Sequence, residues 1–229
     1  MRKSPASAFT LVEMLTVLAI IVVLTGMVVA VGGYVYKKGA LSRATGEIKM
    51  LESACESYKS DNGNYPRDTP ASGISVTDAI NPKVDLICTD AKYAASSLFL
   101  YKELTGDKTG SAGVPDGIPD DGVPRYLKEF EPRILNAVKN PTTKAIISVN
   151  YLQDPFGFPY AYSTSAAKDE QDYQAKLLKN PALRTTLARP TGAALHGFSP
   201  GSFDLWSTGG NTKAENTQDL TWAKWVKSW

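Results

Sequence analysis

A long uncharged segment near the start of the chain constrains its fold more than any other feature. No residue between positions 15 and 36 carries a charge. At ~1.5 Å per residue, a helix over this segment spans about 33 Å, enough to cross the hydrocarbon core of a bilayer. A cleaved secretory signal has a shorter apolar region of roughly 7–15 residues. The segment therefore predicts a retained membrane helix, and a removed signal is the weaker alternative.

The charges around this segment predict its orientation. Arg2 and Lys3 precede the apolar residues, and positive residues favour the cytoplasmic side of a membrane. We therefore expect a single-pass protein whose start is cytoplasmic and whose remainder lies outside. The net charge is only +2, from 25 basic and 23 acidic side chains, and without Arg2 and Lys3 the two counts are equal. Nothing in this balance indicates nucleic-acid binding.

One acidic residue interrupts the apolar start of the helix. Glu13 lies between Val12 and Met14. A carboxylate close to the bilayer is costly and usually has a partner. The alternative is a solvated position at the cytoplasmic interface, and periodicity does not decide between the two.

The residues around Glu13 resemble the prepilin peptidase site of type IV pilins and pseudopilins. They read Ala8-Phe9-Thr10-Leu11-Val12-Glu13-Met14-Leu15. The resemblance implies that prepilin peptidase removes residues 1–8 by cutting between Ala8 and Phe9, and that the Phe9 amine is then methylated. It also implies that Glu13 pairs with the N-terminal amine of a neighbouring subunit, a head-to-tail contact that builds an open filament. Ala8 stands where the family nearly always has Gly, although Ala is also small.

Beyond the membrane segment, apolar residues recur at helical spacing. An amphipathic helix of this kind needs a covering layer, so we expect a sheet to lie on it; a coiled-coil stalk is the alternative, over less than three heptads. Turn residues and a proline end the helix at residues 61–66. The stripe consists of Leu41, Ala44, Ile48, Leu51, Cys55 and Tyr58.

Two C-terminal segments narrow the resemblance to the major (G-type) pseudopilin of type II secretion systems. Residues 154–162 resemble its Asp-Pro-Trp-Gly segment, with Phe156 in place of Trp, and residues 202–209 resemble its following strand. The intervening sequence predicts a helix at 91–103, a loop at 106–122, a strand at 145–149 and a helix at 166–179. Residues 67–149 and 165–190 are insertions relative to the family pattern.

These observations predict an α+β fold. A long N-terminal helix, half transmembrane and half amphipathic, packs on a small C-terminal antiparallel sheet of three or four strands. The expected organisation is a leader at 1–8, a transmembrane helix at 9–36 and a periplasmic pilin-like domain at 37–229.

The resemblance also implies a calcium site in the loop after residues 204–207. The matching positions are Asn211, where the family has Asp, and Asp219, with Glu215 between them. Calcium accepts amide and carboxylate oxygens, although fewer charges weaken binding. The alternative is a loop held by turn hydrogen bonds alone. A second acidic loop at 116–122 resembles a calcium-binding turn, and a solvated acidic turn is its alternative.

One further pattern resembles a catalytic motif. Residues 197–201 match the G-x-S-x-G pattern of hydrolases, but Pro200 has no N–H for an oxyanion hole and a strand follows. We therefore reject a hydrolase function for this segment.

The two cysteines, Cys55 and Cys88, lack the spacing of a metal or redox site. Whether they form a disulfide or remain free thiols stays open.

The resemblance implies a structural role and no enzymatic activity. The chain would leave the bacterial inner membrane to join a periplasmic filament that aids export of folded proteins. Its implied partners are copies of itself, minor pseudopilins, prepilin peptidase and an inner-membrane assembly platform with an ATPase. The alternatives are a type IV pilin for adhesion, motility or DNA uptake, and a membrane-anchored binding or hydrolytic domain.

Overall fold

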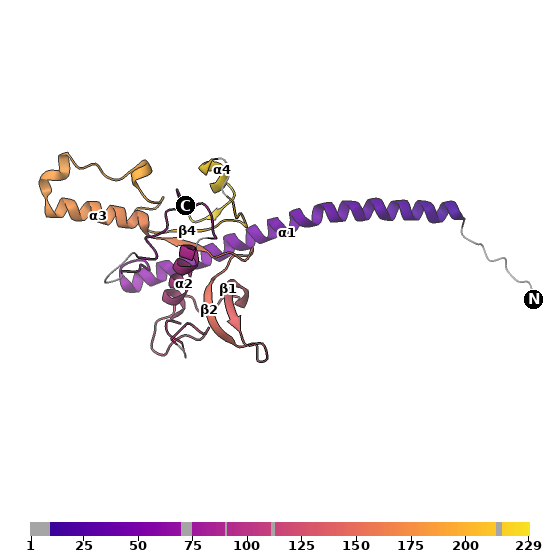
Figure 1. The fold of residues 1–229 in the computed structure, drawn as a ribbon, viewed down its shortest axis with the longest axis horizontal. Coiled ribbons are helices and arrows are strands. Elements are labelled where there is room, and N and C mark those ends of the chain that lie inside the picture. Colours follow the sequence, from indigo (N-terminus) through magenta and orange to yellow (C-terminus); the bar gives the residue numbers. More distant parts are fainter. Residues whose placement is uncertain (1–9, 70–74, 90, 111–112, 214–216) are drawn as a thin grey trace, which may run out of the picture. The chain divides into compact units, whose positions relative to one another are not determined.

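The computed structural model describes residues 10–69, 75–89, 91–110, 113–213 and 217–229. It divides into two compact units, Met1–Ser42 and Arg43–Trp229, and helix α1 (Leu11–Asn62) contributes to both (Figure 1). From Leu11 to Tyr36 the large apolar side chains that the structure describes are exposed. Within the described residues, α1 is the one helix long and apolar enough to cross a membrane. This finding fits the single-pass anchor that the uncharged segment predicts.

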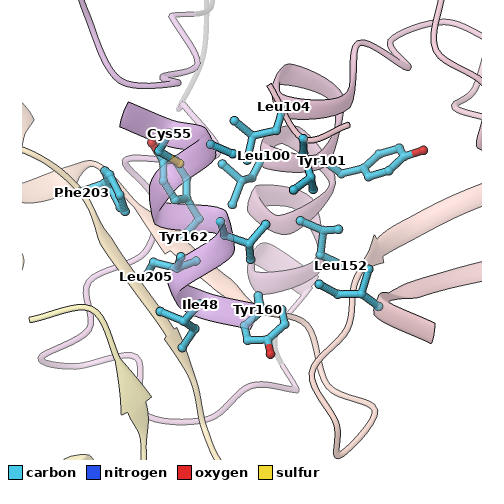
Figure 2. Packing of buried hydrophobic residues seen from close by; sticks show 14 of the residues in the cluster. Ile48, Cys55, Leu100, Tyr101, Leu104, Leu152, Tyr160, Tyr162, Phe203 and Leu205 are labelled. Carbon is cyan, nitrogen blue, oxygen red and sulfur yellow. The ribbon is translucent and has the colours of Figure 1, made fainter. Parts of the chain in front are cut away.

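In the second unit, the predicted apolar stripe of α1 is the centre of the core. Ala44, Ile48, Leu51 and Cys55 are all buried. Figure 2 shows this part of α1 between strand β4 (Asp204–Ser207) and helix α2 (Ala91–Thr105). A sheet alone was expected to cover the stripe, but the α2 side chains Leu100 and Leu104 join the same cluster. The stripe is covered, so the coiled-coil alternative is wrong.

The strands form two separate antiparallel sheets. Strand β1 (Leu135–Lys139) pairs with β2 (Ile146–Leu152) in a hairpin. The C-terminal sheet has the order β3-β4-β5, with β3 at Ala161–Ser163 and β5 at Val226–Lys227. The predicted α+β fold with a small C-terminal antiparallel sheet is therefore confirmed. The predicted strand at 145–149 is confirmed as β2, whereas its partner β1 was not predicted.

The remaining helices are short or lie at the surface. Helix α3 confirms the helix predicted at 166–179, but only its first two residues, Ser165 and Ala166, are buried. The chain then turns back through two 3-10 helices. The elements are α3 (Ser165–Lys179), η1 (Pro132–Ile134), η2 (Pro181–Thr185), η3 (Gly192–Ala194) and α4 (Gln218–Trp222).

The end of α1 follows the sequence signals closely. Gly63 has a φ of 77°, a left-handed conformation that glycine adopts without a steric penalty. Its N–H donates to the Lys59 carbonyl at 2.8 Å, which satisfies one of the last helical carbonyls. The helix therefore ends at Asn62, within the predicted range of 61–66.

The two cysteines lie in different hydrophobic clusters. Cys55 belongs to the cluster around α1 and α2, and Cys88 belongs to a second cluster that contains Trp206 and Trp225. Both are free and buried. Burial raises the pKa of each thiol, because the thiolate loses its hydration. The structure thus favours two unreactive thiols over a disulfide.

Candidate functional sites: the N-terminal segment and the C-terminal motifs

Glu13 caps the start of α1 in this structure. Its Oε2 accepts hydrogen bonds from the Thr10 N–H and the Thr10 hydroxyl, each at 2.8 Å. In return, the Glu13 N–H donates to Thr10 Oγ1 at 3.2 Å. This reciprocal pattern is a capping box, in which a Thr and a Glu three residues later satisfy free N–H groups at a helix start. The carboxylate lies at an exposed helix end.

The two C-terminal segments that carry the resemblance meet in space. The carboxylate of Asp154 accepts hydrogen bonds from the N–H groups of Phe156 and Phe158, each at 2.9 Å, and so closes the turn. It also accepts one from the Ser207 hydroxyl at the end of β4. Gly210 lies against the Phe156 ring, where a Cβ would come within 2.9 Å of a ring carbon. The turn therefore supports the loop that follows β4.

Comparison with known proteins adds one positive finding. Residues 3–29 match the prokaryotic N-terminal methylation motif. The chain carries the N-terminal signature of type IV pilin-like proteins. No curated protein and no solved structure matches it. Ala8 and Phe9, the predicted cleavage and methylation residues, lie within the matched range but outside the residues that the structure describes.

The predicted calcium loop runs from β4 to α4. Both the N–H and the side-chain amide of Asn211 donate to the Thr208 carbonyl, at 3.1 and 2.7 Å. Asp219 is exposed in the first turn of α4, and Glu215 lies outside the described residues. Among the residues that are described, no group of three or more His, Cys, Asp or Glu side chains comes together for a metal.

The chemistry of this loop nevertheless suits calcium. The Thr208 hydroxyl oxygen is buried beside the Cys88 thiol, and it has no hydrogen-bond partner of ordinary geometry in the described part of the chain. Asn211 uses its amide N–H for the loop, so its side-chain oxygen is not needed for that bond. Hydroxyl, amide and carboxylate oxygens are ligands that calcium takes. Thr208, Asn211 and Asp219 are thus the residues that would hold the ion.

All four tryptophans of the chain lie around this loop. Trp206 and Trp225 stack with their ring centroids 5.4 Å apart, and Trp222 and Trp229 both contact Phe198. The far end of the loop is fixed by the Trp222 indole N–H, which donates to the Pro82 carbonyl at 2.9 Å. Tryptophan fluorescence is therefore a direct probe of this region.

The G-x-S-x-G residues have structural partners. Ser199 hydrogen-bonds to Asp204, while the His196 ring lies 3.0 Å from the Asp169 carboxylate on α3. Asp204 also accepts from the Phe198 N–H at 2.8 Å. Serine and histidine are each held by a different aspartate, and β4 follows where a hydrolase has a helix. The segment 197–201 is a turn that leads into β4.

The second acidic loop is organised by its own backbone. The Asp120 carboxylate accepts hydrogen bonds from the N–H groups of Lys108, Thr109 and Gly110 and from the Thr109 hydroxyl. The bonds from Thr109 hold the pKa of Asp120 below its usual value. Asp107, which sequence analysis missed, is fully buried and accepts from Tyr101 and from the Gly117 N–H at 2.7 Å. These carboxylates accept hydrogen bonds from the loop itself and from Tyr101, as expected if the segment is an acidic turn and not a calcium site.

A contact that no sequence pattern predicts joins α1 to the residue before β3. The Tyr160 hydroxyl donates to Glu47 at 2.6 Å. Burial raises the pKa of the Glu47 carboxyl, while Tyr160 and Arg43 oppose that shift. Glu47 lies on the face of α1 next to the apolar stripe, a position where a charged residue is ordinarily solvated. No signal in the sequence indicates its tyrosine partner.

Proposed function

We propose that this chain is a structural subunit of a type II secretion pseudopilus, a periplasmic filament that aids the export of folded proteins. The observation that carries the proposal is the match of residues 3–29 to the N-terminal methylation motif, which supports a pilin-like subunit. The likeness of residues 154–162 and 202–209 to the major pseudopilin supports the secretion branch. In the structure these two segments contact each other through Asp154 and Ser207.

In the proposed pathway, the chain is first inserted into the inner membrane as a single-pass precursor. Prepilin peptidase cuts between Ala8 and Phe9 and the new amine is methylated. Residues 9–36 then span the membrane, and residues 37–229 fold in the periplasm. The assembly platform extracts the chain into a filament with copies of itself and minor pseudopilins. The role is mechanical, with no reaction catalysed by the subunit.

Glu13 is the proposed assembly residue. Its carboxylate is held at the exposed start of α1 by Thr10. After cleavage, the Phe9 amine of a neighbouring subunit is a cation for this carboxylate. An unpaired charge is costly in a bilayer, so the pairing favours head-to-tail association.

Calcium at Thr208, Asn211 and Asp219 is part of the proposal. The ion would link the loop after β4 to α4 and so fix the C-terminal end of the domain. Its expected effect is on stability, because calcium that binds only the folded state favours that state.

Two measurements on the native organism test the function. The intact mass of the membrane-extracted chain should correspond to a start at methylated Phe9; a start after residue 30 would mean ordinary secretion. Deletion of the gene should leave exported folded proteins in the periplasm, and the wild-type gene should restore export. Normal export combined with loss of surface filaments would identify a type IV pilin instead.

A further inference from the structure

A basic arm extends from the second unit. We use this name for residues 173–190, which comprise the C-terminal part of α3, η2 and the residues after it. The arm contains no acidic residue. Lys176, Lys179 and Arg184 are exposed, and their side chains form no hydrogen bond or ion pair with any residue that the structure describes. Leu178, between them, is 78% exposed.

The structure of a single chain does not explain why the arm carries these cations and an exposed leucine. Lys176 and Lys179 lie in the last turn of α3, where cations complement the helix dipole. That effect explains neither the cation at Arg184 nor the exposure of Leu178. From residue 167 to residue 196 no side chain is buried, so this part of the chain covers little apolar surface of its own domain.

A second surface of the same chain has the opposite charge, and we call it the acidic loop. We use this name for residues 114–122, which include Asp116, Asp120 and Asp121 and no basic residue. Ile118 at its tip is 68% exposed. The hydrogen bonds to Asp120 and to Asp107 fix the loop before any partner arrives, which lowers the entropic cost of binding.

The arm and the loop of one chain do not satisfy each other. Among the described residues no hydrogen bond or ion pair joins them, and Figure 1 shows α3 on one side of the end of α1 and the loop after α2 on the other. Two complementary surfaces at different places on one chain make a heterologous contact, which extends into an open filament.

We propose that the basic arm of one copy docks on the acidic loop of a neighbouring copy. Leu178 packs against Ile118, and Lys176, Lys179 and Arg184 surround the aspartates of the loop. This inference rests on the proposed filament and names a contact between its subunits outside the membrane. Both surfaces lie in insertions relative to the family pattern, so the contact would belong to this chain and not to the family in general.

Crosslinking between two tagged full-length copies tests the docking. One copy carries Ile118→Cys and the other Leu178→Cys, and they are co-expressed with the assembly machinery. Cys55 and Cys88 are buried, so they do not compete for the crosslinker. The matched control replaces Ile118→Cys by Val138→Cys, a 49% exposed position beside Lys139. We expect a dimer that contains both tags in sheared filaments, at roughly tenfold higher yield than the control.

Charge reversal separates docking from random collision. Lys176→Glu, Lys179→Glu and Arg184→Glu together on the Leu178→Cys copy should lower the yield roughly tenfold, since like charges then face each other. Asp121→Lys on the other copy should restore part of it; Asp121 is exposed and its side chain holds no described loop contact. Filaments with crosslinking at the control level would overturn the docking and leave the filament proposal standing. Processed chain that forms no filament would overturn both.

Discussion

The Ser207 hydroxyl donates a hydrogen bond to the Asp154 carboxylate across 53 residues of sequence. This bond joins the turn at residues 154–158 to the end of β4. Because the same carboxylate also accepts two N–H groups of its own turn, the turn and the strand are held as one unit.

Replacing Asp154 should therefore destabilise the whole C-terminal region. Asp154→Ala leaves three hydrogen-bond donors without their acceptor, and a buried unpaired donor costs about 1–3 kcal/mol. We expect a loss of about 3 kcal/mol in the free energy of unfolding, against about 1 kcal/mol for Ser207→Ala, which removes one bond. Denaturant unfolding of the detergent-extracted chain, followed by tryptophan fluorescence, measures both. Equal losses would contradict the central role of Asp154.

A second buried carboxylate makes a pH-dependent prediction. Burial raises the pKa of Asp204 above its usual 3.8, more than the bonds from Ser199 and Phe198 lower it. A carboxyl whose folded-state pKa is raised stabilises the fold at low pH, and this contribution is lost as pH rises through that pKa. Asp204→Asn should thus gain stability relative to wild type as pH rises above about 4, the usual pKa of an aspartate in an unfolded chain. Melting temperatures of the two proteins should diverge above that pH; parallel curves would show that Asp204 titrates normally.

The role of Glu13 is separable into capping and charge. Glu13→Gln keeps a side chain that completes a capping box, whereas Glu13→Val loses both the cap and the charge. We expect both variants to insert in the membrane and fold, and both to fail in filament assembly, because the charge that meets a neighbouring amine is gone. Sedimentation of sheared filaments, with the variant as the sole subunit, measures assembly. Normal filaments from Glu13→Gln would show that the charge is not required.

The calcium proposal predicts a ligand-dependent melting temperature. Calcium at ~100 Kd raises the stability of a folded state that binds it by about 2.7 kcal/mol. We expect the chain to melt higher in calcium than in chelator, with the tryptophans around the loop as the probe. Asp219→Ala should remove most of the difference and Asn211→Asp should enlarge it. Asp121→Ala, in the acidic loop, should leave this difference in melting temperature unchanged. If Asp121→Ala abolished the difference instead, calcium would bind at residues 116–122.

The sequence by itself determined the features that depend on neighbouring residues. The uncharged segment at 15–36 predicts α1 because helix formation and membrane insertion both depend on a continuous stretch of chain. Thr10 and Glu13 form their capping box within one helical turn, and Gly63 ends the helix locally. Helices α2 and α3 were likewise visible in local composition and periodicity.

Only the tertiary structure decided the features that depend on the path of the chain. The Glu47–Tyr160 contact joins residues 113 apart in sequence, and no periodicity encodes such a pair. The stripe on α1 predicts a covering layer but does not specify that α2 shares it with β4, because many apolar surfaces satisfy the same burial requirement. The state of Cys55 and Cys88 was open for the same reason: a disulfide depends on the distance between two thiols, and folding places these two in separate clusters.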